Sequence, residues 1–454
     1  MIDAITTAGV EPHSVMVVHR GAVVAEGWWA PYSADRPHLL YSVTKTVTAM
    51  AVGIAIHDGL LALDDRVVDL LPDRVPAAAP AQAHRLTVHH LLSMSAGHDA
   101  DTLDDAWEGE PADLVRGFLS LPFGAREGTR HTYDNATTFV LARILERVTG
   151  RDLADYLDDH VFHPMGIDDA EWDRVGSGAV FGFHGLHLRT EALAAFGELL
   201  RCGGAWEGRQ LIPRAWVDRA TARHLDSRHY GDDEHGPDFL AGYGYQVWLC
   251  RDGFHANGAF GQHGIVIPAH ELVVAVTSAQ YTVAQAQDVL DAVHDRLLPG
   301  LDHPGTAAQD EALAARLRTL ALPPVSGTAG HREPSAAVVH CPVDAPALPP
   351  EARATLEPLD GGWTLRLDGL GDIAVGHGQW AESSPRGRAV CASGAWDSGV
   401  FHARLRVIST PHHLAFTLDP RRGRAELAWD TVPLTTPDLR LHLTAPLMTR
   451  PQYA

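Results

Sequence analysis

A serine and a lysine three residues apart could together perform nucleophilic chemistry in this chain. The two residues are Ser42 and Lys45, and they lie at the start of a segment with helical spacing of its apolar residues. Those apolar residues are Val43, Val47, Met50 and Ile54. Residues three apart share one face of a helix, so the lysine amine can lie beside the serine hydroxyl. A desolvated lysine can take the proton that a serine must lose to become a nucleophile. The alternative is that Ser42 is only the N-cap of this helix.

The scarcity of two residue types supports the chemical interpretation. Lys45 is the only lysine, although lysine and arginine together number 36. Asn135 and Asn257 are the only asparagines. A biased composition explains why these residues are rare, but it does not explain their placement. The single lysine lies three residues after a serine, where an amine that can be deprotonated is needed and an arginine would stay charged.

Both asparagines lie in segments where side chains can point at a site. Tyr133 and Asn135 precede a predicted helix that ends at Gly150. Asn257 lies within His255-Ala256-Asn257-Gly258, in the first of two predicted strands between residues 254 and 280. Two structural alternatives stay open here: Tyr133 as a core aromatic residue, and Asn135 as the N-cap of its helix.

Three motifs in this order resemble those of the penicillin-recognising serine hydrolases. The motifs are Ser42-x-x-Lys45, Tyr133-Asp134-Asn135 and the glycine-rich strand segment. The superfamily includes class C β-lactamases, D-alanyl-D-alanine peptidases and β-lactamase-like esterases. The resemblance covers about residues 10 to 300. It implies an α/β fold of the β-lactamase/transpeptidase type, in which an antiparallel sheet is flanked by helices and joined by a helical subdomain.

The resemblance implies a role for each matching residue. Ser42 matches the nucleophile, Lys45 its base, and Tyr133 the residue that passes a proton to the leaving group. Asn135 matches the amide that orients the substrate and the lysine. The backbone N–H of Ser42 and an N–H near Ala256 are expected to form the oxyanion hole.

The third motif departs from the usual pattern of Lys-Thr-Gly or His-x-Gly. Here it is His255-Ala256-Asn257-Gly258, and His263 in the following Gly-Gln-His-Gly offers a second histidine. A neutral imidazole would hold a substrate carboxylate less firmly than a lysine. We therefore expect short neutral esters to be better substrates than anionic β-lactams. If His255 contacts the substrate, its protonation near pH 6 should reduce the difference in kcat/KM between neutral esters and anionic β-lactams.

The motifs together predict a serine hydrolase that forms an acyl-enzyme with a small ester or amide and needs no metal or cofactor. One alternative is a D-amino-acid peptidase or amidase. Another is a penicillin-binding-like receptor module that does not turn over its ligand. Four histidines lie close together, but their spacing does not match a zinc site: His84, His89, His90 and His98.

The chain divides into two predicted domains. Residues 1–322 form the hydrolase domain, 323–334 a linker rich in proline and glycine, and 335–454 a small all-β domain of unknown role. We expect a hairpin from Ser14 to Tyr32 that turns at Arg20-Gly21. The charged segment from Ser227 to Pro237 is predicted to be a flap. If the C-terminal domain only packs beside the hydrolase domain, truncation near Pro323 should leave a soluble, active fragment.

Composition limits the partners and the compartment. The formal charge of −21 argues against nucleic acid and against an anionic membrane surface. No signal-peptide pattern or spanning apolar run is visible, and the cysteines are widely separated. We therefore expect a cytoplasmic protein. Its oligomeric state is not indicated by the sequence.

Overall fold

The computed structural model describes the chain except residues 228–235, 302, 304, 331–338, 350 and 445–454. Residues 228–235 of the predicted flap and 331–334 of the predicted linker therefore lie outside the described residues. Contacts divide the chain into two compact units. The first comprises Met1–Gly27 and Leu39–Arg318, and the second comprises Trp28–His38 and the described residues from Thr319 onward. This division falls four residues before the expected boundary at 323, and it assigns an N-terminal segment to the second unit.

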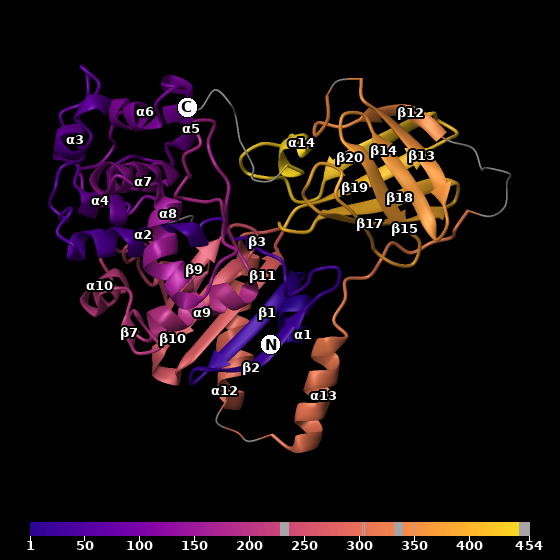
Figure 1. The fold of residues 1–454 in the computed structure, drawn as a ribbon, viewed down its shortest axis with the longest axis horizontal. Coiled ribbons are helices and arrows are strands. Elements are labelled where there is room, and N and C mark those ends of the chain that lie inside the picture. The colour runs from indigo at the N-terminus through magenta and orange to yellow at the C-terminus, as the bar shows by residue number, and fades with distance from the viewer. Residues whose placement is uncertain (228–235, 302, 304, 331–338, 350, 445–454) are drawn as a thin grey trace. The chain divides into compact units, whose positions relative to one another are not determined.

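A six-stranded sheet forms the centre of the first unit (Figure 1). Its order is β2 (Ala22–Trp28), β1 (Glu11–His19), β11 (Leu272–Ala279), β10 (Gln262–Ile267), β9 (Gly253–Gly258) and β8 (Trp248–Cys250). The last five strands pair in antiparallel fashion. Arg20 and Gly21 both have positive φ and form the two-residue turn between β1 and β2, which confirms the predicted hairpin.

Helix α9 (Thr190–Arg201) packs on one face of this sheet, against β1, β10 and β11. Small residues make the close approach possible: a Cβ on Gly197 would lie 2.6 Å from the Val273 side chain. The terminal helices α1 (Ile2–Thr7) and α11 (Ala284–Ala292) pack against each other. After α11 come α12 (Leu298–Leu301) and α13 (Ala307–Arg318).

A group of helices lies to one side of the sheet in Figure 1. The group consists of α3 (Val67–Leu70), α4 (Val88–Leu92), α5 (Leu103–Gly109), α6 (Leu114–Ser120), α7 (Asn135–Thr149) and α8 (Leu153–Leu157). Helix α2 (Val43–His57) contacts α7 and α8 of this group and also β9 and β10 of the sheet. Helix α10 (Arg214–Ala220) also contacts α2, and a small sheet joins β3 (His38–Leu39), β5 (Leu186–Leu188) and β4 (Glu171–Trp172). A sheet flanked by helices and joined to a helical group confirms the predicted β-lactamase/transpeptidase-like fold.

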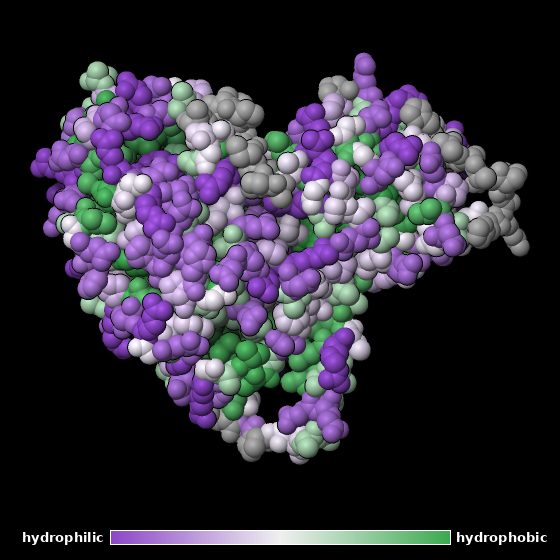
Figure 2. All heavy atoms as spheres, in the orientation of Figure 1, coloured by the Kyte–Doolittle hydropathy of each residue, from purple (hydrophilic) through white to green (hydrophobic). Residues whose placement is uncertain are grey.

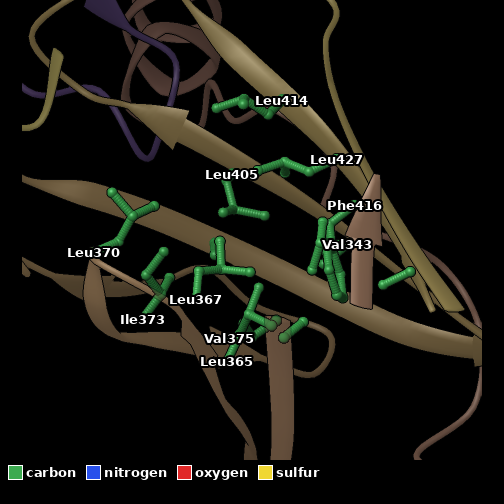
Figure 3. Close-up of a cluster of buried hydrophobic side chains, with 14 of the residues drawn as sticks. Val343, Leu365, Leu367, Leu370, Ile373, Val375, Leu405, Leu414, Phe416 and Leu427 are labelled. Carbon is green, nitrogen blue, oxygen red and sulfur yellow. The ribbon is translucent and has the colours of Figure 1, made fainter. Parts of the chain in front are cut away.

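The second unit contains a closed barrel, so the predicted all-β C-terminal domain is confirmed. Its eight strands are β12 (Val339–Asp344), β13 (Arg353–Leu359), β14 (Gly362–Leu367), β15 (Gly371–Gly376), β17 (Val390–Asp397), β18 (Val400–Val407), β19 (His413–Asp419) and β20 (Arg424–Trp429). The pairing of β15 with β17 closes the ring, and β16 (Ala381–Ser383) adds to β17. Alternating residues such as Leu365, Leu405 and Phe416 fill the interior (Figure 3).

Hydrophilic residues predominate on the face drawn in Figure 2. An apolar patch lies near α13, on which Leu313 is 43% exposed. Among the described residues, no helix is both long enough and apolar enough to cross a membrane.

Candidate functional site

Ser42 and Lys45 are in hydrogen-bonding contact at the start of α2. Ser42 occupies the N-cap position, but its side chain makes no capping hydrogen bond. Lys45 Nζ instead donates to Ser42 Oγ at 2.8 Å and to the Phe183 carbonyl at 3.0 Å. The hydroxyl is therefore paired with the amine rather than with the helix backbone, as proton transfer between them requires.

The Lys45 amine lies in a buried environment that favours its neutral form. The residue is 1% exposed, and burial lowers its pKa to about 7. The carboxylates of Asp101 and Asp134 oppose this effect and keep the pKa from falling further. At neutral pH a substantial fraction of Lys45 is thus unprotonated and able to accept a proton.

Tyr133 lies beside the lysine. The Lys45 Nζ is 4.9 Å from the centroid of the Tyr133 ring. The Tyr133 ring is also stacked on Trp248 of β8, with centroids 5.7 Å apart and planes at 15°. The serine, the lysine and the tyrosine that the sequence singled out are therefore brought together in one place.

Asn135 is the first residue of α7, and its predicted alternative role as N-cap is wrong. Asp134 is the cap, and its carboxylate accepts from the Ala136 N–H at 3.0 Å. Asn135 is held by Asp101 instead: its Nδ2 donates to Asp101 Oδ2 at 2.5 Å and its backbone N–H to Oδ1 at 3.0 Å. Burial and the neighbouring Asp134 raise the pKa of Asp101 to about 6.

The two histidines of the third motif are buried in the protein. His255 is 0% exposed, packs edge-on against Phe239, and has its pKa lowered by burial to about 3. His263 is also 0% exposed, accepts from Gln280 Nε2 at 3.3 Å, and has its pKa lowered by burial to about 4. Neither ring is therefore charged near pH 6, so the structure gives no support for the expected change of specificity at that pH.

The end of β9 lies close to the segment that leads to Ser42. A Cβ on Gly258 would be 2.1 Å from the Leu40 carbonyl oxygen, so only glycine fits there. Ala256 pairs with Gly264 on the sheet face that α9 covers, and Asn257 is half-buried. The register puts Ala256 and Asn257 on opposite faces of the strand.

Two backbone N–H groups in this region have no acceptor within the part of the chain that the structure describes. One belongs to Ser42 and the other to Ala259, immediately after Gly258. Free N–H groups beside a nucleophile can stabilise the negative oxygen that forms when it attacks a carbonyl. The second donor was expected near Ala256, but that residue lies within β9, whereas Ala259 follows it in the turn.

The sequence did not predict three residues that contact the motifs but lie far from them in the chain. Asp101 holds Asn135, the Phe183 carbonyl accepts from Lys45, and Trp248 supports Tyr133. No local spacing connects these residues to their partners. Asp134 was visible in the sequence, because an aspartate directly before a helical stripe indicates an N-cap. Across the described residues, no group of three or more histidine, cysteine, aspartate or glutamate side chains could hold a metal ion.

Comparisons with known proteins identify the family of this chain. A family model described as Beta-lactamase matches residues 7–297, so the chain belongs to the beta-lactamase family. Its relatives include the 6-aminohexanoate-dimer hydrolase of Paenarthrobacter ureafaciens, which is 27% identical over 269 residues, 55% of this chain and 67% of that protein. The esterase EstB of Burkholderia gladioli is 32% identical over 154 residues, 31% of this chain and 39% of the esterase.

A solved structure shows the same fold. The putative 6-aminohexanoate-dimer hydrolase from Bacillus anthracis aligns with a TM-score of 0.55 at 18% identity, over 66% of this chain and 82% of that one. A sequence identity this low supports a shared fold but not a shared function. The relatives are hydrolases of the beta-lactamase fold, and they indicate a hydrolase here.

Proposed function

We propose that this protein is a serine hydrolase that acts on a small ester or amide through an acyl-enzyme. The observation that carries this proposal is the buried Lys45 amine, which contacts the Ser42 hydroxyl at 2.8 Å and has a pKa of about 7. A lysine with an ordinary pKa would be almost fully charged at neutral pH and could not act as a base.

The arrangement suggests a sequence of proton transfers. Lys45 takes the proton of Ser42, whose Oγ attacks the substrate carbonyl carbon, and the oxygen that becomes negative is bound by the N–H groups of Ser42 and Ala259. When the tetrahedral intermediate collapses, the bond to the leaving group breaks and the leaving group takes a proton from Tyr133, which recovers one from protonated Lys45. Water then loses a proton to Lys45 as it attacks the acyl carbonyl carbon, and Ser42 Oγ leaves with that proton as the ester bond breaks. Asn135, held by Asp101, orients the substrate beside Lys45.

The charges around the site favour an uncharged substrate. The pKa of Asp101 is about 6, so its carboxylate is mostly ionised at pH 7 to 8. Lys45 is the only lysine, and the buried His255 stays neutral. The Asp101 carboxylate would repel an anionic β-lactam, and the neutral third motif would supply no positive charge to offset this repulsion. We therefore propose that p-nitrophenyl acetate and butyrate are hydrolysed with a higher kcat/KM than nitrocefin.

The test is turnover of these esters together with labelling by a fluorophosphonate probe. Ser42→Ala should abolish both, while Ser120→Ala, which removes an exposed serine hydroxyl at the end of α6, should leave both unchanged. Labelling without turnover would favour a receptor module, and faster hydrolysis of D-amino-acid amides would favour the amidase. Turnover by Ser42→Ala would overturn the proposal.

We also propose that the protein works in the cytoplasm on a small-molecule substrate. All four cysteines are free thiols, as a reducing compartment would keep them.

A further inference from the structure

Two aromatic residues beside the site have a backbone conformation that side chains rarely adopt. Tyr41, directly before Ser42, has φ 49°, and Phe260, directly after Ala259, has φ 60°. For a bulky residue such an angle is unfavourable, and it persists only when the surrounding structure enforces it. Each of the two unusual residues is thus the chain neighbour of one free N–H group.

The two side chains are in contact with each other. Their ring centroids are 5.3 Å apart with the planes at 52°. On another side, the His184 ring stacks on Tyr41 with centroids 5.9 Å apart and planes at 22°. Tyr41 is 3% exposed, so its ring is enclosed rather than offered to solvent. Aromatic contacts of this kind fix the relative position of the segments that carry them.

The backbones of both residues are also fixed. The Tyr41 carbonyl accepts from the Thr44 hydroxyl at 2.6 Å and from the Thr44 N–H at 3.1 Å. The Phe260 carbonyl accepts from the Gln280 N–H at 3.0 Å and from Gln262 Nε2 at 3.1 Å. The close approach of Gly258 to Leu40 brings the same two segments together at a second point.

We propose that the contact between Tyr41 and Phe260 is a positioning device for the oxyanion hole. The pair fixes the Ser42 N–H, on the α2 segment, relative to the Ala259 N–H, in the turn after β9. The rings themselves do not react with the substrate. This inference rests on the proposed function, because it assumes that the two N–H groups bind the carbonyl oxygen during acyl transfer.

Glycine substitutions in the full-length protein test the device. Tyr41→Gly and Phe260→Gly remove the ring and favour the same positive φ, so the backbone strain is relieved rather than increased. Each should lower kcat for p-nitrophenyl acetate by about 10- to 100-fold, less than the ~10²- to 10³-fold cost of deleting an oxyanion donor. KM should change little, and Tyr41→Phe, which keeps the ring, should stay within about threefold of wild type.

Three further readouts separate positioning from general damage. The double glycine variant should be no slower than the slower single variant, because either change already breaks the contact. The midpoint of the pH–rate profile should not move, since Lys45 is untouched. Glu271→Gly, at φ 47° in a remote turn, should leave kcat unchanged. Multiplicative losses in the double variant, a shifted midpoint, or unchanged kcat in both single variants would each overturn the inference.

These outcomes differ from a failure of the proposed function. If Ser42→Ala is inactive while both glycine variants keep full activity, only the positioning role is wrong. If Ser42→Ala retains activity, the serine mechanism itself is wrong.

Discussion

At the scale of single residues, the state of Lys45 depends on two opposed effects. Burial favours the neutral amine, whereas the carboxylates of Asp101 and Asp134 favour the charged form. The resulting pKa of about 7 lies near the pH at which a general base is most useful. In the proposed mechanism, Asp101 would therefore have two roles: it holds Asn135 and it raises the pKa of Lys45.

Asp101→Asn tests the electrostatic part of this account. The substitution removes a negative charge that raises the pKa of Lys45, so that pKa should fall, and the rise of kcat/KM with pH should move to lower pH. The asparagine oxygen can still accept one of the two hydrogen bonds that Asn135 donates, so the contact is retained in part. Profiles for p-nitrophenyl acetate between pH 5 and 9 check this. A midpoint that stays in place or moves to higher pH would contradict it.

The sequence could predict the part of the site that is local in the chain. Ser42 and Lys45 are three residues apart on one helix, so their contact follows from helical geometry. The Phe183 carbonyl lies 138 residues from Lys45, and Asp101 lies 34 residues from Asn135. Such contacts depend on how the elements pack, and no periodicity in the sequence encodes that.

At the scale of elements, α2 is enclosed on all sides. Every residue from Val43 to Ala55 is buried. Thr46 Oγ1 donates to the Gln246 carbonyl and Thr48 Oγ1 to the Gly182 carbonyl, both at 2.7 Å. A helix held in this way presents Ser42 and Lys45 in a fixed orientation.

Gly53→Ala should disturb that enclosure. The added Cβ would lie 2.0 Å from the ring of Trp216, whose indole N–H donates to the Ala49 carbonyl at 3.0 Å. We expect the free energy of unfolding to fall by about 1–3 kcal/mol, as overpacking does. Gly109→Ala, at the end of α5 with open space around it, should change it by less than ~0.5 kcal/mol. Urea denaturation measures both, and equal midpoints would contradict the account.

Turn residues and strand patterns predicted which elements form, but they did not predict how the strands pair. Arg20-Gly21 gave the correct hairpin, and the short strands after residue 335 gave an all-β domain. The pairing of β1 with β11 connects strands from the two ends of the first unit, and the pairing of β15 with β17 closes the barrel. Both are long-range pairings, which single-strand patterns do not specify.

At the scale of the whole molecule, an N-terminal segment belongs to the second unit. The Ala30 N–H donates to the Leu320 carbonyl at 3.1 Å, and the Leu322 N–H donates to the Ala30 carbonyl at 2.7 Å. The Tyr32 hydroxyl donates to the Thr410 carbonyl at 3.4 Å. This segment, Trp28–His38, is followed directly in the chain by Leu39 to Ser42, so residues of the second unit immediately precede the segment that carries Ser42.

A truncation after Arg318 should therefore harm the protein, contrary to the expectation from the linker composition alone. It removes the partners of Ala30 and Tyr32, and we expect most of the soluble protein and of the esterase activity to be lost. Arg36→Gln in the full-length chain is the control. It breaks only a partly exposed pair with Glu382, worth about 0–1 kcal/mol, and should stay active. A soluble fragment with wild-type kcat would contradict this view.

The most direct test of the account is the acylation rate as a function of pH, because its central claim is that neutral Lys45 activates Ser42. In the wild-type protein, the burst of p-nitrophenol from p-nitrophenyl acetate should quicken as pH rises through about 7, where the Lys45 amine loses its proton, and then level off. Lys45→Arg keeps the charge and removes the base, so its burst should be at least ~10²-fold slower and lack this rise. A Lys45→Arg variant that acylates within a few-fold of wild type, with the same dependence on pH, would contradict the claim.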